Sequence, residues 1–553
     1  MEAKDGTEWE GELIGVSPEE FLIWFRIQVN NLRKKIYTST QEEIRDEINK
    51  FFGFYLERVE DKKIRCEINL LFYELLNQYG YYFNSEKTFE NMIVRFNDSE
   101  IKQDLLSKYP IRFKLIYSTS LLAYFNLKRT STPPEEIATK DFITPALPCK
   151  FYLTSVYNEY LTNNNVLNKH QLVRCLSSLG GYLGMLSRWY EALYFLNLAQ
   201  EIDPTDPVTV SMKAGVLEGV EEKTCSDYSS ILLLETYDLS RTISKSDQVL
   251  ESDKPHFREL EKRIRKTFRT HKISISKVRS HKTTHARKSK KYSDYEKFCL
   301  DKALFLTEHS IYCVCKKSMR DDIKIRSGHE HTQIEYVDRF ESILSSLRYD
   351  FILARQNYYH SLPNSYMRGF NLKNIKSTDK RKDIKDALLK DSFRLCYSVL
   401  DTIGITILEA LDIDYVAILK EKYPEQRVDV HFTNLWDLDL IPESEFKINY
   451  YLQSLYSIAY EMKNEKYSGL KKYREIRNAI EHRIFHITDE RVNNKKGKSE
   501  YYIQRKELQE MTQVLLVYTK SLIFTYVNFI RKVSVYKDPE YQKKYGDERS
   551  ISH

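Results

Sequence analysis

The sequence predicts an all-α fold with an array of helical hairpins followed by a bundle of long helices. Apolar residues recur at the three- and four-residue spacing of amphipathic helices over much of the chain, and only 16 Gly and 13 Pro interrupt it. About 42% of the residues are hydrophobic and 13% are aromatic, which suits large buried cores. Because 553 residues exceed the size at which a single core stops growing, about two to four domains are expected.

The first expected helix has a well-defined start at Ser17-Pro-Glu-Glu20. The Ser17 side chain can accept a hydrogen bond from the Glu20 amide, Glu20 can close a capping box, and Pro18 suits the first helical position. Apolar spacing predicts further helices in this part of the chain at about residues 40–60, 62–78 and 110–127.

A stretch between Leu176 and Pro204 predicts a closely packed helical hairpin. Gly180 and the alanines let two antiparallel helices approach closely, and Pro204 ends the second one. The spacing resembles that of a tetratricopeptide (TPR) repeat, with an ordinary αα-hairpin as the alternative. One repeat is not stable alone, so neighbouring helices are expected to be degenerate repeats or caps. The matching positions are Leu176, Leu179, Gly180, Leu183, Ala192, Leu196, Ala199 and Pro204.

The positive charge of the chain is concentrated in one run. Lys262 to Tyr292 holds 13 Lys or Arg and no acid, and subtracting these cations from the formal net charge of +7 leaves −6 for the rest. Local positive charge attracts polyanions, so a nucleic-acid-binding segment centred on Lys262 to Lys291 is one hypothesis. A solvated linker or a charged helix face is the alternative, and few aromatic residues are present for base stacking.

The compartment and cofactor predictions rest on what the sequence lacks. Eight scattered cysteines do not form a disulfide framework, and residues 1–12 lack the apolar core of a signal peptide. No stretch reaches the roughly 18 apolar residues of a membrane span. We therefore expect a cytoplasmic protein with no membrane partner. Glycine-rich phosphate loops, HExxH and GxSxG patterns are absent, which disfavours nucleotide-driven and serine-hydrolase functions.

One set of side chains offers a possible zinc site. Cys313-Val-Cys315 is followed by His329-Glu-His331, and four such groups are able to bind zinc. The C-x-C and H-x-H spacings differ from those of the usual zinc fingers, and neighbouring cysteines often serve packing. We therefore expect no metal site and no other cofactor.

The most compact set of groups suited to phosphate chemistry lies between Leu470 and His486. Arg477, Asn478 and His482 have the functional groups for metal-free RNA cleavage. An imidazole can take a proton from a ribose 2′-hydroxyl or give one to the leaving oxygen. A guanidinium stabilises charge on the phosphorane, and an amide orients a phosphate oxygen.

Helix geometry suggests that one chain holds only part of this site. Asn478 and His482 share a helix face, whereas Arg477 and His482 lie roughly 140° apart around an ideal helix. One histidine does not easily perform both proton transfers, so a second copy in a symmetric homodimer would help. The cations expected to hold flanking phosphates of an RNA substrate are Lys471, Lys472, Arg474 and Arg483.

A structural explanation of the same stretch competes with the catalytic one. Arg477 and Glu481 are four residues apart on the predicted helix and form a common salt-bridge spacing. The R-x4-H spacing also arises often by chance, so the surroundings of the motif have to decide between the two.

Those surroundings resemble a known family. Tyr473 to Arg483, on a late helix of the predicted bundle, resembles the R-x4-6-H motif of HEPN domains, including the polar residue after the arginine. Earlier segments look like those of a prokaryotic subfamily in which TPR-like repeats lead into a HEPN domain. These segments are Tyr295 to Leu306, Arg348 to Tyr359 and Ser392 to Ile403.

The resemblance implies an endoribonuclease that is active as a dimer without a metal ion, often as a toxin or antiviral effector. It assigns catalytic roles to Arg477, Asn478 and His482 alone. Some HEPN proteins are inactive scaffolds, so the alternative is a non-catalytic adaptor. In that alternative, the TPR-like region binds a protein partner and the HEPN-type bundle dimerises.

Together, these patterns predict six segments. Long helices are expected in the bundle at about residues 333–361, 382–412, 446–466, 468–486 and 503–532. In chain order we expect an N-terminal helical region, TPR-like hairpins, a basic linker, a connecting segment, a HEPN-type bundle and a polar tail. Their predicted bounds are 1–145, 146–245, 246–292, 293–332, 333–536 and 537–553.

Overall fold

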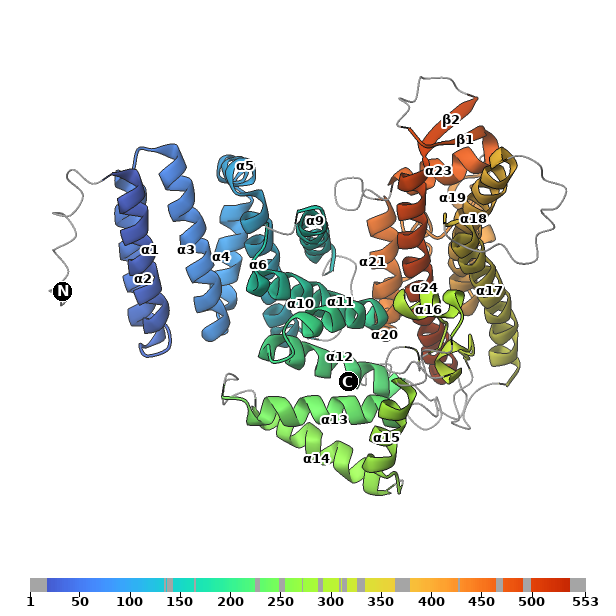
Figure 1. The fold of residues 1–553 in the computed structure, drawn as a ribbon, viewed down its shortest axis with the longest axis horizontal. Coiled ribbons are helices and arrows are strands. Elements are labelled where there is room, and N and C mark those ends of the chain that lie inside the picture. The colour runs from blue at the N-terminus through green and yellow to red at the C-terminus, as the bar shows by residue number, and fades with distance from the viewer. Residues whose placement is uncertain are drawn as a thin grey trace. The chain divides into compact units, whose positions relative to one another are not determined.

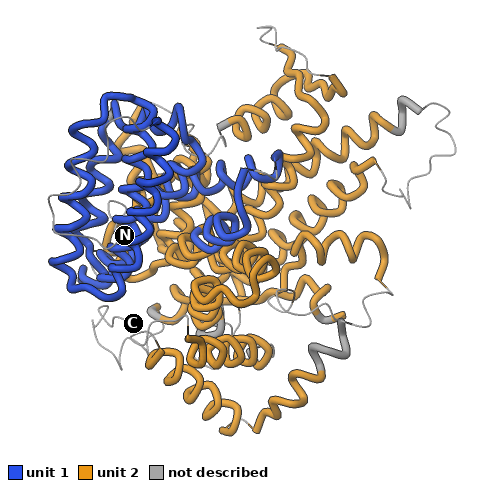
Figure 2. The backbone as a smooth tube through the Cα atoms, turned by 60° about the vertical axis from the view of Figure 1, so that its left-hand side comes forward, with its two compact units in different colours: residues 1–133, 148–178 blue, residues 134–147, 179–553 orange. Residues whose placement is uncertain are grey.

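The computed structural model is predominantly helical, which confirms the predicted fold class (Figure 1). Its contacts divide the chain into unit 1, Met1–Pro133 with Pro148–Ser178, and unit 2, Pro134–Leu147 with Leu179–His553 (Figure 2). The six predicted segments remain a prediction. The structure describes residues 17–133, 136, 143–163, 166–223, 229–247, 254–270, 272–286, 292–307, 310, 316–325, 334–363, 378–425, 428–463, 471–490 and 499–537.

Unit 1 consists of successive helices joined by short turns. The predicted capping box is confirmed, because Ser17 Oγ accepts from the Glu20 amide and a Glu20 carboxylate oxygen accepts from the Ser17 amide. Buried rings of α1 and α2, including stacked Phe25 and Phe51, form part of the core. The helices are α1 (Pro18–Lys35), α2 (Gln41–Arg58), α3 (Lys62–Tyr82), α4 (Glu86–Phe96), α5 (Ser99–Lys108), α6 (Pro110–Ser131) and α9 (Pro148–Thr162).

The close helical packing predicted around Gly180 is confirmed. Helix α10 (Lys169–Met185) begins in unit 1 and ends in unit 2, where Gly180 faces α11 (Trp189–Ile202). A Cβ atom on Gly180 would lie 2.4 Å from Cγ of Leu196, so a larger residue does not fit without a shift. Helix α11 ends two residues before Pro204, as expected. The arrangement is consistent with a TPR-like hairpin.

The segment predicted as a basic linker is largely helical where it is described. Helix α14 (Lys254–Thr270) packs on α13 (Ser229–Lys245), which follows α12 (Pro207–Lys223), and precedes α15 (Ile275–Ala286). Its apolar side chains lie at helical spacing, and all of its cations except Lys254 are exposed on the remaining surface. The alternative of a charged helix face therefore fits α14 better than a linker does. The buried apolar residues are Phe257, Leu260, Ile264 and Phe268.

Long helices form the C-terminal part of unit 2, as predicted, but the helix expected over residues 446–466 is broken at Asn449 and Tyr450. Helix α18 contacts α17, α23 and α24, and α21 also contacts α23 and α24. Helix α24 is long and apolar enough to cross a membrane, but 78% of its most apolar window is buried, as in a core helix. The elements are α16 (Asp294–Asp301), α17 (Ile334–Ser361), α18 (Thr378–Ala410), α19 (Tyr415–Lys422), α20 (Glu443–Ile448), α21 (Tyr451–Lys463), α23 (Lys471–His482) and α24 (Arg505–Tyr536).

The helix that carries the candidate motif is shorter than predicted. The expected helix over residues 468–486 ends at His482, and Ile484–Thr488 instead forms strand β1. This strand pairs in parallel with β2 (Glu500–Gln504), and the rings of Phe485 and Tyr501 stack across the pair. Pairing with β2 satisfies backbone groups that a longer helix would have satisfied internally. His482 is therefore the last residue of its helix.

A buried ionic network ties the helical hairpin to the bundle within unit 2. The Arg188 side chain, which is fully buried, lies 2.7 Å from a carboxylate oxygen of Glu191 and 2.5 Å from one of Glu461 on α21. Tyr518 of α24 donates a hydrogen bond to the other oxygen of Glu461, at 3.0 Å. One guanidinium therefore compensates two carboxylates that the fold has removed from water.

Replacing Arg188 tests how strongly this network holds unit 2 together. Arg188→Met leaves two buried carboxylates without their cation, and we expect a loss of about 3–5 kcal/mol in the free energy of unfolding. Thermal or denaturant unfolding measures the loss. Arg394→Met is the matched control because Arg394 also pairs with an acid three residues away, Asp391, but on the surface, where such a pair contributes about 0–1 kcal/mol. Equal losses in the two variants would contradict the account.

A second buried network fixes the segment before the bundle. Arg355 of α17 lies 2.8 Å from an Asp321 carboxylate oxygen and donates to the Leu304 carbonyl and the Tyr295 hydroxyl. Nearby, Lys520 of α24 is buried and donates to the Ala303 carbonyl. Burial lowers the pKa of Lys520 to about 7, with Asp321 opposing this shift and Arg355 adding to it.

The lowered pKa of Lys520 predicts a pH-dependent stability difference. Between pH 10.5 and about 7, Lys520 binds a proton in the unfolded chain but not in the folded protein. The contribution of Lys520 to the free energy of unfolding therefore decreases as the pH falls through this range. The unfolding temperature of Lys520→Met should therefore rise relative to that of the wild type as the pH falls towards 7. Below about pH 7 the difference between the two unfolding temperatures should stay constant. The control is Lys506→Met, whose lysine on the same helix is 81% exposed. A pH-independent difference for Lys520→Met would exclude the proposed titration.

Candidate functional site

Helix α23 packs on the bundle through one apolar face. Tyr473, Ile476 and Ala479 are buried, and the Tyr473 ring stacks on Phe393 of α18 with the ring centroids 5.9 Å apart. Residues three and four apart share a helix face, so the polar residues of this helix also gather together. Arg474, Arg477 and Asn478 therefore lie along one flank of the packed face.

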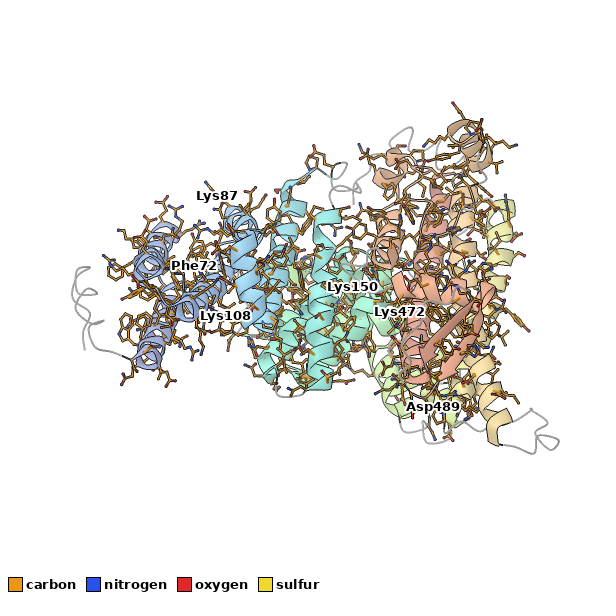
Figure 3. The ribbon with its side chains drawn as sticks, turned by 90° about the horizontal axis from the view of Figure 1, so that it is seen from above. Phe72, Lys87, Lys108, Lys150, Lys472 and Asp489 are labelled. Carbon is orange, nitrogen blue, oxygen red and sulfur yellow. The ribbon has the colours of Figure 1, made fainter. Side chains whose placement is uncertain are left out.

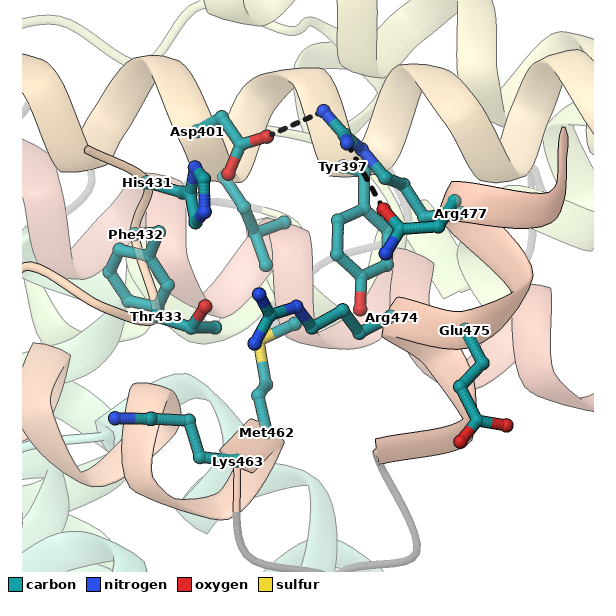
Figure 4. A pocket seen from close by; sticks show the side chains of 12 residues that line it. Tyr397, Asp401, His431, Phe432, Thr433, Met462, Lys463, Arg474, Glu475 and Arg477 are labelled. Atoms are coloured by element: carbon teal, nitrogen blue, oxygen red, sulfur yellow. Dashed lines mark hydrogen bonds and ion pairs between the residues drawn. The ribbon is translucent and has the colours of Figure 1, made fainter. Parts of the chain in front are cut away.

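Both Arg477 and Asn478 line a pocket of about 560 Å³ (Figure 4). Its walls come from α18, α21, α23 and the loop before α20. The close-up shows the side chains of Arg474, Arg477 and His431 directed towards a common space. The lining residues are Tyr397, Leu400, Asp401, His431, Phe432, Thr433, Met462, Lys463, Arg474, Glu475, Arg477 and Asn478.

A glycine allows the loop to reach the pocket. A Cβ atom on Gly404 of α18 would lie 2.7 Å from the backbone N and Cα of Phe432, so the loop backbone approaches the helix where a side chain would stand. The ring of Phe432 is fully buried. Asn434 closes the turn by accepting from the His431 amide at 2.7 Å and donating to the Asp429 carbonyl at 2.8 Å. His431 thus has a fixed backbone position at the pocket.

Arg477 is shared between two carboxylates. One guanidinium nitrogen lies 3.5 Å from Asp401 and another lies 3.1 Å from Glu481, while Asn478 Oδ1 accepts a hydrogen bond at 3.2 Å. Burial raises the pKa of the Asp401 carboxyl, and the neighbouring Arg477 and His431 oppose that shift. The Arg477–Glu481 salt bridge expected by the structural explanation is present, but Arg477 is also held at the pocket by a different helix.

The structure brings together two of the three predicted catalytic residues. Arg477 and Asn478 face the pocket, whereas His482 is not among the lining residues. Its side chain is 69% exposed, and its Nε2 lies 3.8 Å from a carboxylate oxygen of Glu481. His482 is therefore open to solvent at the end of its helix, and the dimer expected to complete the site remains a prediction.

The predicted phosphate-binding cations lie in different environments. Arg474 lines the pocket, whereas Lys472 forms an ion pair with Glu507 of α24. Figure 3 labels Lys472 on its helix. Arg483 is exposed just beyond the helix end. Outside the described residues or side chains lie Lys471 and the zinc candidates Cys313, Cys315, His329 and His331.

Sequence reasoning missed several polar residues of the pocket, among them Asp401, His431 and Lys463. Asp401 lies within the segment Ser392 to Ile403 that resembles the family, so its acidic side chain could have been predicted as part of the site. His431 and Lys463 follow no motif spacing and reach the pocket only through the fold. Burial lowers the pKa of Lys463, and the nearby charge of Arg474 adds to that effect.

Comparison with known proteins agrees with the family seen in the motif. Residues 329–532 match the protein family described as LA2681-like HEPN. No curated protein and no solved structure matches the chain. The matched range runs from before α17 into α24, and it includes the pocket together with Arg477 and His482. This chain therefore carries, at residues 329–532, a C-terminal HEPN domain of the LA2681-like family.

Proposed function

We propose that the protein is a metal-independent endoribonuclease of HEPN type that cleaves RNA by attack of a ribose 2′-hydroxyl on the adjacent phosphorus. The observation that carries this proposal is the pocket in which Arg477 and Asn478 of an intact R-x4-H motif lie beside Arg474. The enzyme would act as a homodimer in the cytoplasm. The family resemblance favours a toxin or an antiviral effector as its biological role.

The two arginines suit the binding of an RNA phosphate. A guanidinium has five N–H donors in a planar fork that matches the spacing of phosphate oxygens. The contacts of Arg477 with Asp401, Glu481 and Asn478 leave N–H donors available for a phosphate. Arg474 forms no ion pair with a carboxylate in the described parts of the chain, so its charge is available to the pocket. These positive groups would stabilise the charge that builds up on the phosphorane.

His482 would supply proton transfer. As a neutral imidazole it takes the proton of the 2′-hydroxyl while the 2′-oxygen forms a bond to phosphorus. The bond from phosphorus to the 5′-oxygen breaks, its electron pair goes to that oxygen, and a proton completes the 5′-hydroxyl product. The other product ends in a 2′,3′-cyclic phosphate. The exposure of His482 leaves it accessible to RNA and to a second copy of the chain.

A non-catalytic adaptor is the second candidate, and one observation favours it. Arg477 already pairs with Asp401 and Glu481, and His482 lies outside the pocket, as a structural role would allow. In that case the TPR-like helices would bind a protein partner, and the HEPN domain would serve dimerisation.

An RNA-cleavage assay in EDTA separates the two candidates. The purified wild-type protein should cut RNA and leave 2′,3′-cyclic phosphate ends. His482→Ala should reduce the single-turnover rate by about 10²–10⁴-fold because it removes a group that transfers a proton. Arg477→Ala should also lose most of the activity because it removes a charge that stabilises the phosphorane.

His256→Ala is the matched control for the histidine variant. The His256 side chain is 64% exposed and lies 3.9 Å from a glutamate, Glu218, much as His482 lies near Glu481, but it belongs to α14. This control should cut RNA at the wild-type rate. Undiminished cleavage by His482→Ala would remove the proposed site, and an inert wild-type protein would favour the adaptor.

A further inference from the structure

The candidate reaction needs a second group that handles protons, and the pocket contains one. The motif supplies one histidine, yet cleavage requires that one proton leave the 2′-oxygen and another reach the 5′-oxygen. His431 lines the same pocket as Arg477 and Asn478, although it belongs to a loop between α19 and α20. A single chain therefore carries one imidazole in the pocket of the candidate phosphate-binding arginines and another at the exposed end of α23.

The position of His431 is built into the fold. Gly404 gives the backbone of Phe432 room against α18, and Asn434 holds the His431 amide through its side-chain oxygen. The Phe432 amide lowers the pKa of the Asp401 carboxyl, against the larger effect of burial. The contacts of Gly404 and Asn434 fix the backbone of His431 and Phe432, and the His431 side chain lies beside Asp401 (Figure 4).

His431 and His482 lie in different surroundings. The His431 side chain lies beside Asp401 in the pocket (Figure 4). The His482 side chain is open to solvent on the end of α23. Because the motif histidine is assigned to take the 2′-hydroxyl proton, the imidazole inside the pocket is the group left to give a proton to the 5′-oxygen.

We propose that His431 is the general acid of the RNA cleavage reaction. This inference rests on the proposed ribonuclease activity. A phosphate bound at Arg477 would lie in the pocket that His431 lines, and the exposed His482, of this chain or of a second copy, would approach it from the solvent. An in-line displacement requires the base and the acid on opposite sides of the phosphorus.

The proton balance of the step follows directly. His482 takes the 2′-hydroxyl proton as the 2′-oxygen bonds to phosphorus. The bond from phosphorus to the 5′-oxygen breaks, and the His431 imidazolium gives its proton to the departing 5′-oxygen. The products are a 2′,3′-cyclic phosphate and a 5′-hydroxyl. Exchange with water then returns both imidazoles to their starting protonation states.

A substrate that does not need the acid tests this assignment. The cleavage position would first be mapped on unmodified RNA, and the same RNA would then be made with sulfur in place of the 5′-bridging oxygen at that position. A thiolate leaves without a proton because thiols are far stronger acids than alcohols. His431→Ala should slow cleavage of the oxygen substrate by about 10²-fold or more, yet should cut the sulfur substrate at nearly the wild-type rate.

The comparison with His482→Ala makes the test specific. Loss of the base should slow cleavage of both substrates, because the 2′-hydroxyl still has to be deprotonated. His431→Asn, which keeps a polar side chain at this position, should show the same substrate dependence as His431→Ala. Full activity on the sulfur substrate also shows that a variant is folded.

Three outcomes would overturn the inference. Wild-type cleavage of the oxygen substrate by both His431 variants would show that His431 takes no part, and equal losses on both substrates would show that it is not the acid. In both cases the ribonuclease proposal would stand. A wild-type protein that cuts neither substrate would instead remove the ribonuclease proposal, and the inference with it.

Discussion

The packing of α23 on α18 is the constraint on which the candidate site depends. The stacked rings of Tyr473 and Phe393 and the burial of Ile476 fix the rotation of α23 about its own axis. That rotation turns Arg474, Arg477 and Asn478 towards the pocket and leaves His482 at the exposed end of the helix. The same helix α18 supplies Asp401, so one helix contact sets both the position of Arg477 and that of its carboxylate partner.

Charge balance in the pocket offsets the repulsion among its positive side chains. Asp401 and Glu481 offset the charge of Arg477, and an RNA phosphate would add a further partner without requiring the arginine to move far. Helix α11 is part of the same compact unit, and Arg188, directly before it, is joined to Glu461 on α21. Helix α21 also supplies Met462 and Lys463 to the pocket. A partner that moved α11 would therefore act on the pocket through Arg188 and helix α21.

Features set by local chemistry were predictable from the sequence. The capping box at Ser17, the close packing at Gly180 and the long helices of the bundle each follow from short-range spacing, and the structure confirms them. The strand after His482 was missed because its pairing with β2 is a tertiary contact that overrides the helical pattern. His431 was missed for a similar reason, because only the close approach of its loop to Gly404 brings it to the motif.

The central claim is that the pocket supports cleavage of RNA through the ribose 2′-hydroxyl. Its most direct test is single-turnover cleavage, in EDTA, of one RNA in its natural form and with 2′-O-methyl groups throughout. The account predicts that the protein cuts only the natural RNA, because methylation removes the attacking hydroxyl. Equal cutting of both RNAs would contradict the account, since attack would then have to come from another nucleophile.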